Sequence, residues 1–165
     1  MAAPLKRIVL AIGLPGSGKS AYLARRGITA LSSDFLRKLL FDNPADQRLP
    51  HLVFGALRHL LRLRLLAGRR VSYVDATNLT RADRRHFFRI AEQFSCVVDA
   101  IYFDVPLEEC LERNRRRSRR VPDEALRRMA GKLEPPTLAE GFRRIIVVGA
   151  AAGKPRSADT ADGVS

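Results

Sequence analysis

The stretch Gly13-Leu-Pro-Gly-Ser-Gly-Lys-Ser20 decides the fold of this chain. It matches the pattern G-x-x-x-x-G-K-[ST] in full and follows the apolar run 7–12, whose β-branched residues suit a strand buried on both faces. The glycines let the backbone turn with its N–H groups inward, where they bind phosphate oxygens, while the lysine reaches the β- and γ-phosphates and the serine hydroxyl ligates Mg²⁺. The motif therefore predicts a P-loop that binds ATP with magnesium, through Gly13, Pro15, Gly16, Ser17, Gly18, Lys19 and Ser20.

Length and composition fit one globular domain. The 165 residues are 46% hydrophobic, and no apolar run approaches the roughly 18 residues of a transmembrane helix. No signal peptide is visible, so we expect a cytoplasmic protein without a membrane partner. Cys96 and Cys110 lack the C-x-x-C spacing of a redox or zinc site, and we expect both to pack as small apolar residues.

The charge of the chain is strongly positive. Thirty Lys and Arg against 17 Asp and Glu give a net charge of +13, which favours polyanionic partners such as nucleic acid or nucleotide phosphate. Only five of the thirty are lysines, so a compositional bias towards arginine is the alternative explanation.

Five short β-rich runs alternate with stretches of helical pattern, which predicts an α/β fold with a central parallel sheet of about five strands flanked by helices. The runs are 7–12, a second that ends at residues 32–34, 71–75, 97–103 and 145–148. Between them we expect a leucine-rich helix closed by Gly68, a helix opened by Thr80 or Asp83 whose phenylalanines form a packing face, and a helix after Pro106. Residues 1–149 should form one domain, and 150–165 a disordered tail.

Three carboxylate and guanidinium groups are candidates for chemistry beside the P-loop. Asp75 ends a strand, the position of a residue that holds magnesium, although a helix cap is the alternative. Asp34 and Arg37 are three residues apart in the first turn of a predicted helix and share one side of it. Asp34 could accept the proton of an attacking hydroxyl while Arg37 neutralises charge on the transferred phosphoryl group; the alternative is an N-cap with a surface arginine.

The densest charge of the chain is an arginine-rich segment after a short amphipathic helix. Six arginines fall within the eight positions 113–120, and their mutual repulsion disfavours a purely structural role. We expect a lid over about 107–130 that closes on the triphosphate and stabilises transition-state charge. A solvated face or a nucleic-acid patch is the alternative.

Together these motifs resemble the polynucleotide 5′-hydroxyl kinases, and most of all the kinase module of bacterial RNA end-healing and repair enzymes. The resemblance covers about residues 5–149. Besides the P-loop it rests on Ser32-Ser33-Asp34-Phe-Leu-Arg37, Asp46-Gln47, Val74-Asp75-Ala-Thr-Asn78, Glu112-Arg113-Asn114 with Arg117 and Arg120, and Glu140-Gly-Phe142.

The resemblance implies a P-loop kinase with a helical lid, which transfers the γ-phosphate of ATP to the 5′-OH of RNA or DNA. Asp34 would be the general base, with Arg37 and Gln47 on the acceptor. Among the lid residues, Arg113 and Arg120 would bind ATP phosphates and Arg117 the donor and acceptor phosphates at the reaction centre. Lys19 would be catalytic, and Ser20 and Asp75 would hold magnesium. Arg115, Arg116 and Arg119 are extra to the pattern and have no assigned role.

The repair enzymes carry a phosphatase and a ligase-like domain as well. This chain has no D-x-D-x-[TV] phosphatase motif, so we expect 5′ phosphorylation alone, with a separate ligase or phosphatase as a candidate partner. Two other functions stay open: a small-molecule or zeta-toxin-like sugar-nucleotide kinase, and a nucleotide-gated nucleic-acid-binding module. The sequence also leaves open GTP as the donor and a homo-oligomer.

Overall fold

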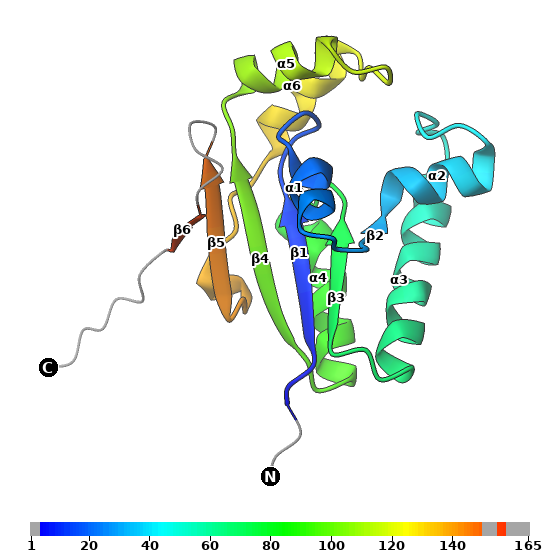
Figure 1. Ribbon diagram of the computed structural model, residues 1–165, viewed down its shortest axis with the longest axis vertical. Coiled ribbons are helices and arrows are strands. Elements are labelled where there is room, and N and C mark those ends of the chain that lie inside the picture. The colour runs from blue at the N-terminus through cyan, green and yellow to red at the C-terminus, as the bar shows by residue number, and fades with distance from the viewer. Residues whose placement is uncertain (1–3, 150–154, 158–165) are drawn as a thin grey trace, which may run out of the picture.

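A sheet of five parallel strands, extended by one short antiparallel strand, forms the centre of the computed structural model, which describes residues 4–149 and 155–157 (Figure 1). The spatial order is β2-β3-β1-β4-β5-β6, so β1 lies between β3 and β4. The strands are β1 (Arg7–Ile12), β2 (Leu31–Ser32), β3 (Val71–Asp75), β4 (Val97–Asp104), β5 (Arg144–Gly149) and β6 (Pro155–Ser157). The prediction of an α/β fold with a five-stranded parallel sheet is confirmed.

Two expectations about the chain differ from the structure. The second strand ends at Ser32 rather than at residue 34, because the Ser32 side chain accepts a hydrogen bond from the Phe35 backbone N–H (3.2 Å) and starts helix α2. The tail predicted to be disordered includes β6, whose residues pair with residues 146–148 of β5 and so satisfy backbone groups of an edge strand. The rest of that predicted tail lies outside the described residues.

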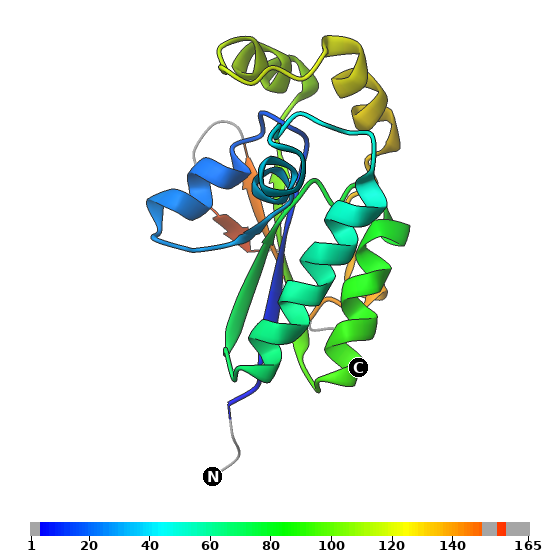
Figure 2. The ribbon, with the colours of Figure 1, turned by 90° about the vertical axis from the view of Figure 1, so that its right-hand side faces the viewer.

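The helices form layers on both faces of the sheet and at one end of it (Figure 2). Two long helices, α3 and α4, cover one face and the short α1 covers the other, while α5 and α6 lie beyond the carboxyl ends of the strands. Their bounds are α1 (Lys19–Arg25), α2 (Ser33–Phe41), α3 (Pro50–Leu66), α4 (Arg81–Gln93), α5 (Leu107–Arg115) and α6 (Asp123–Lys132), followed by the 3₁₀ turn η1 (Leu138–Glu140).

Helix α3 shows why the leucine pattern produces this packing. Leu57, Leu61 and Leu65 recur every four residues and are fully buried against the sheet, whereas Leu60 and Leu63 face outward. Each buried leucine contributes about 1.5–3 kcal/mol relative to an exposed one, so this stripe fixes the helix on the sheet. The phenylalanines of α4 pack into the same cluster, as predicted.

A separate apolar cluster holds the two lid helices together. Leu111 and Leu126 are buried between α5 and α6, and Cys110 is buried with them. Cys96 is partly buried against the main core, so both cysteines pack as expected and neither forms a disulfide. The lid therefore has a small core of its own, next to the P-loop residue Leu14.

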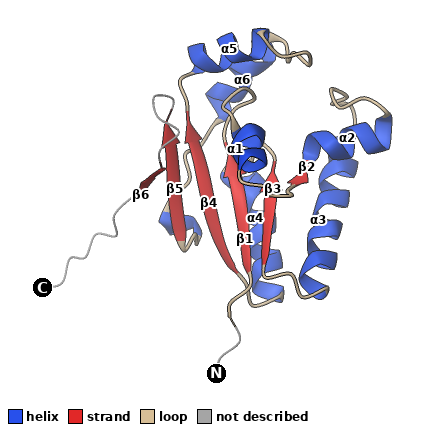
Figure 3. Cartoon of the chain, in the orientation of Figure 1, coloured by secondary structure: helices blue, strands red, loops and turns tan. Residues whose placement is uncertain are grey.

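No helix within the described residues is long and apolar enough to cross a membrane. The parallel strands all end at the same edge of the sheet, where loops lead from β1 and β3 towards the helices (Figure 3). Ligands of open α/β sheets bind at this edge, outside the carboxyl ends of the strands.

Candidate active site

The P-loop joins β1 to α1 at the carboxyl edge of the sheet. Gly16 and Gly18 lie in the left-handed region, with φ of 80° and 94°. A Cβ at Gly16 would lie only 2.6 Å from the backbone carbonyl oxygen of Cys110 in α5. Glycine is therefore required at this position both for its backbone conformation and for the close approach of the lid helix.

Lys19 is buried and directs its ammonium group back onto the loop. Its Nζ donates to the carbonyl oxygens of Gly13 and Leu14, both at 2.9 Å. Burial lowers the pKa of Lys19 to about 8, and the carboxylates of Asp75 and Asp34 partly oppose this shift. A phosphate entering the loop would offer the ammonium a stronger, charged partner than these two neutral carbonyls.

Ser20 and Asp75, the two residues predicted to hold magnesium, meet beside the P-loop. The Ser20 hydroxyl donates to Asp75 Oδ2 at 2.6 Å, and the Asp75 carboxylate is nearly buried at the end of β3. Hydroxyl and carboxylate oxygens are the hard donors that Mg²⁺ prefers, and this ion commonly completes its shell with water and substrate phosphates. The residues present therefore fit a magnesium ion.

Asp34 lies across the cavity from the P-loop, in the first turn of α2. Its Oδ1 accepts a hydrogen bond from Arg37 Nη1 at 3.0 Å, so the predicted pair forms. Arg37 is buried, with its guanidinium 5.9 Å from the ring centre of Phe54 in α3. Asp34 also accepts from Arg119 of the lid, a contact that the sequence pattern did not predict.

The lid arginines divide into two groups. Arg113 reaches down to the P-loop, where its Nη1 donates to the Ser17 carbonyl oxygen at 3.4 Å, and Glu109 pairs with the same guanidinium. Arg115 and Arg116 instead pair with acids of the lid itself, Asp123 and Glu112, at 3.1 and 2.7 Å; Arg120 pairs with Asp123 at 3.4 Å. Arg115 and Arg116 do not line the cavity beside the P-loop, whereas Arg113 and Arg120 line it despite their ion pairs.

One cavity of about 530 Å³ lies between the P-loop, α2 and the lid. Its volume is within the usual range for a small-molecule site. Most of the residues predicted for the site line it: Pro15, Gly16, Gly18, Lys19, Ser20, Asp34, Arg37, Gln47, Asp75, Arg113, Arg117 and Arg120. Gly13 and Ser17 lie behind this surface, where Ser17 is buried.

The walls of the cavity also contain residues for which the sequence offered no role. Arg119, Phe54 and Met129 line it, together with Thr77 of the loop after β3. Arg119 is one of six arginines at positions 113–120, and Phe54 and Met129 are ordinary apolar residues of helices. Nothing in the sequence sets these residues apart as parts of a site. Within the described residues, the buried Ser17 Oγ and Arg37 Nε have no hydrogen-bond partner, and such groups usually bind a ligand or water.

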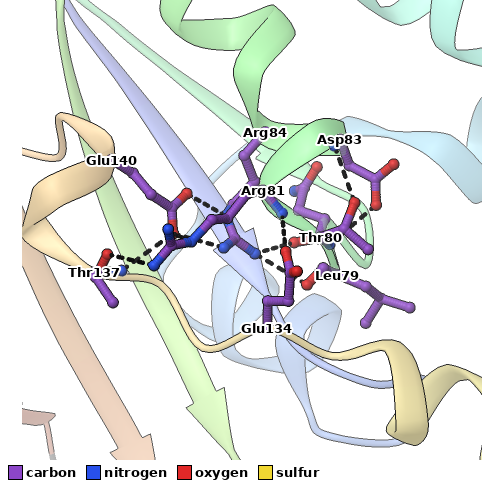
Figure 4. A network of polar contacts seen from close by, with 9 residues as sticks. Leu79, Thr80, Arg81, Asp83, Arg84, Glu134, Thr137 and Glu140 are labelled. Atoms are coloured by element: carbon purple, nitrogen blue, oxygen red, sulfur yellow. Dashed lines mark hydrogen bonds and ion pairs between the residues drawn. The ribbon is translucent and has the colours of Figure 1, made fainter.

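A buried polar network ties the loop after β3 to the segment that follows the lid (Figure 4). Arg84 is fully buried; it donates to both oxygens of Glu140 at 2.8 and 2.7 Å and to the carbonyls of Asn78 and Leu79. Asn78 in turn donates to the Ala11 carbonyl of β1 at 2.8 Å. These bonds fix the turn that follows Asp75, so the Asp75 carboxylate rests on a rigid support.

The same network anchors the end of the lid. The Glu134 carboxylate, just after α6, accepts a hydrogen bond from the Arg81 backbone N–H at 2.6 Å, and the Glu134 N–H donates to the Leu79 carbonyl at 2.9 Å (Figure 4). Thr80 and Asp83 form the capping box that starts α4 beside it. The end of the lid is therefore anchored to the start of α4 by hydrogen bonds.

Fold and site together define the class of protein. A P-loop at the edge of a parallel sheet, facing a carboxylate and covered by an arginine-bearing lid, is the arrangement of a P-loop kinase. The family model described as an AAA domain matches residues 8–136, and the chain belongs to this family. The P-loop and this family match together indicate that the domain binds a nucleoside triphosphate.

The known proteins to which this chain is similar carry names that point to different substrates. L-seryl-tRNA(Sec) kinase of Mus musculus is 38% identical over 53 residues, which are 32% of this chain and 15% of that protein. A chain of the Pnkp1/Rnl/Hen1 RNA repair complex has a TM-score of 0.66 and 21% identity, over 80% of this chain and 45% of that one. The APS kinase CysC of Mycobacterium tuberculosis has a TM-score of 0.59 and 20% identity, over 91% of both chains. The two structural likenesses concern the fold alone.

Proposed function

We propose that this kinase transfers the γ-phosphate of ATP to the 5′-hydroxyl end of a polynucleotide, RNA or DNA. The observation that carries the proposal is the Asp34–Arg37 pair, which shares one cavity with the P-loop and the lid arginines. A carboxylate opposite the phosphate loop suits a hydroxyl acceptor, because it can take up the proton that the alcohol loses. The fold likeness to a chain of an RNA repair complex supports the polynucleotide as that acceptor.

In the proposed reaction the acceptor oxygen forms a bond to the γ-phosphorus while the bond from that phosphorus to the β–γ bridging oxygen breaks and ADP leaves. Asp34 takes the hydroxyl proton. The P-loop backbone and Lys19 bind the triphosphate, Arg113 and Arg120 its outer oxygens, and Arg117 the transferred group. Ser20 and Asp75 would hold Mg²⁺, which supplies positive charge to the phosphates when bound.

The acceptor side of the site contains two more groups. Arg37 lines the cavity and places its positive charge beside an acceptor phosphate. Gln47 lines the same wall and offers an amide to the sugar or base. A separate phosphatase or ligase would carry out the other reactions of end repair, since this chain is proposed to perform only the 5′ phosphorylation.

Label transfer from γ-labelled ATP to 5′-OH RNA and DNA oligonucleotides, with Mg²⁺, tests the proposal. Asp34→Asn should lower kcat by a factor of about 10²–10⁴, the usual contribution of a general base. The matched control is Glu92→Gln, an exposed carboxylate of α4 far along the chain from the site, which should label like wild type. Absence of transfer to every oligonucleotide, or equal rates for Asp34→Asn and wild type, would reject the proposal.

A small-molecule kinase is the second candidate. The APS kinase likeness spans 91% of both chains, and a cavity of this volume suits a compact acceptor as well as a strand end. A panel of sugars, nucleosides and sugar nucleotides, assayed beside the oligonucleotides, separates the two. Turnover of one such compound, without inhibition by oligonucleotides, would favour the small-molecule kinase. Tight oligonucleotide binding without any transfer would instead indicate a nucleotide-gated binding module.

A further inference from the structure

Arg119 contacts the carboxylate that the proposed reaction uses as its base. It stands in the segment between α5 and α6 and donates to Asp34 Oδ2, while Arg37 donates to Oδ1 of the same carboxylate. Both oxygens of Asp34 are therefore engaged by guanidinium groups. Each oxygen keeps a further lone pair, but a hydroxyl or water at either oxygen must share it with a guanidinium group until one arginine withdraws.

The two arginines differ in how they can withdraw. Arg37 lies three residues from Asp34 in the same helix and is buried, so its position is fixed by α2. Arg119 belongs to the lid, 85 residues along the chain, and its side chain is 30% exposed. Movement of the lid by a small amount would break the Arg119 contact and leave the Arg37 contact intact.

We propose that Arg119 is a gate on Asp34, which hinders the base from activating water until an acceptor arrives. A P-loop kinase that closes on ATP alone risks hydrolysis, in which a water oxygen bonds to the γ-phosphorus, the bond to the bridging oxygen breaks, and Asp34 takes the proton. With Arg119 on Oδ2, the water must compete with the guanidinium for that oxygen. The structure thus assigns a role to an arginine that lies outside the family pattern.

The group that opens the gate must compete with Asp34 for the Arg119 guanidinium, so it is an anion. A shallower groove of about 460 Å³ runs outward from Asp34 and is lined by Arg119, Lys38, Ser118 and Phe35. With Arg117, which also lines it, the groove offers three cations, a hydroxyl and an exposed aromatic ring, which suit a phosphate carried beside the acceptor hydroxyl. This part of the inference rests on the proposed function, in which that anion is a phosphate of the acceptor strand.

The gate is tested by phosphate release from ATP and Mg²⁺ in the absence of any acceptor. Arg119→Ala should raise this hydrolysis about threefold or more, the factor expected when an exposed ion pair no longer occupies the carboxylate. Arg119→Lys, which keeps the charge but loses the fork of donors, should give a smaller rise. The matched control is Arg116→Ala, since this lid arginine pairs with Glu112 and does not line the cavity.

The double variant Asp34→Asn with Arg119→Ala separates a gate from a change in lid structure. If the extra hydrolysis requires the base, the double variant should return to the wild-type rate or below; titration with ATP shows that each variant still binds nucleotide. Hydrolysis that does not rise in either Arg119 variant, or that stays high in the double variant, would overturn the gate. This assay contains no acceptor, so it tests the role of Arg119 independently of the polynucleotide substrate. Failure to phosphorylate any oligonucleotide would refute the proposed function but not the gate.

Discussion

Substitution of Gly16 by alanine should disable nucleotide binding through a clash that can be read from the structure. Gly16 has a φ of 80°, a conformation that costs a residue with a Cβ about 1–2 kcal/mol. The added Cβ would lie 2.6 Å from the Cys110 carbonyl oxygen, which is 0.8 Å inside the 3.4 Å at which ordinary contact begins. Backbone on both sides cannot yield by side-chain rotation, so either the P-loop or α5 must shift.

A shift of this size displaces the N–H groups that bind phosphate, and a misplacement of about 1 Å can cost a factor of 10² in rate. We therefore expect Gly16→Ala to raise the Kd for ATP at least about tenfold and to lower kcat/KM about 100-fold. Isothermal titration with ATP and steady-state kinetics measure the two effects.

Gly68→Ala is the matched control, because Gly68 has nearly the same φ, 78°, and nothing within 4 Å of an added Cβ. Gly68→Ala should lower stability only by the cost of placing a Cβ at this positive φ, which lowers Tm by about 2–8 °C in a protein of this size. It should bind ATP like wild type. If Gly16→Ala also bound ATP with the wild-type Kd, the contact between the P-loop and α5 would not constrain the loop, and the reasoning would fail.

Three further predictions concern stability and pH. Glu140→Gln leaves the buried Arg84 charge without its partner and should lower the free energy of unfolding by about 3–5 kcal/mol in a denaturant titration; a loss under 1 kcal/mol would contradict this. Gly55→Ala, in the interior of α3 with open space around the new Cβ, should stabilise the fold by about 0.5–1 kcal/mol in the same assay, and a loss would show a hidden clash. Since the Lys19 pKa is about 8 in the folded protein against 10.5 in the unfolded chain, this group should make stability rise between those pH values and should weaken ATP binding about tenfold from pH 7 to pH 9; an equal Kd at both would contradict it.

The regular parts of the fold were predictable because local patterns and tertiary packing agree there. The apolar run of β1 and the strand β3 have the bounds that the sequence indicates, and Thr80 and Asp83 both take part in starting α4. The second strand was misjudged at its end, since Ser32 belongs to the strand and also caps the next helix. A two-residue strand has too little pattern for its end to be placed from sequence.

Residues far apart in sequence were predicted to meet only where a motif links them. Lys19, Ser20 and Asp75 are linked in this way, because their strands end at one edge of the sheet. The Arg84–Glu140 pair joins residues 56 positions apart, and nothing in the surrounding sequence distinguishes Arg84 from the exposed arginines of α4. Burial of a charge is decided by the full packing of the fold, so the sequence alone could not single it out.

Ion pairs in the arginine-rich lid reduce the free positive charge that the sequence suggests. Six arginines in eight positions predict strong repulsion, yet five of them have acidic partners, Glu109, Glu112, Asp123 or Asp34. Among the described lid arginines, only Arg117 lines the cavity without an ion pair to an acid. The charge that the lid offers to a triphosphate is therefore concentrated on Arg117 and on whichever neighbours a ligand can release from their acids. If Asp34 is the base, as proposed, release of Arg119 would also expose Asp34 Oδ2, and phosphate binding and proton transfer would be coupled through a single side chain.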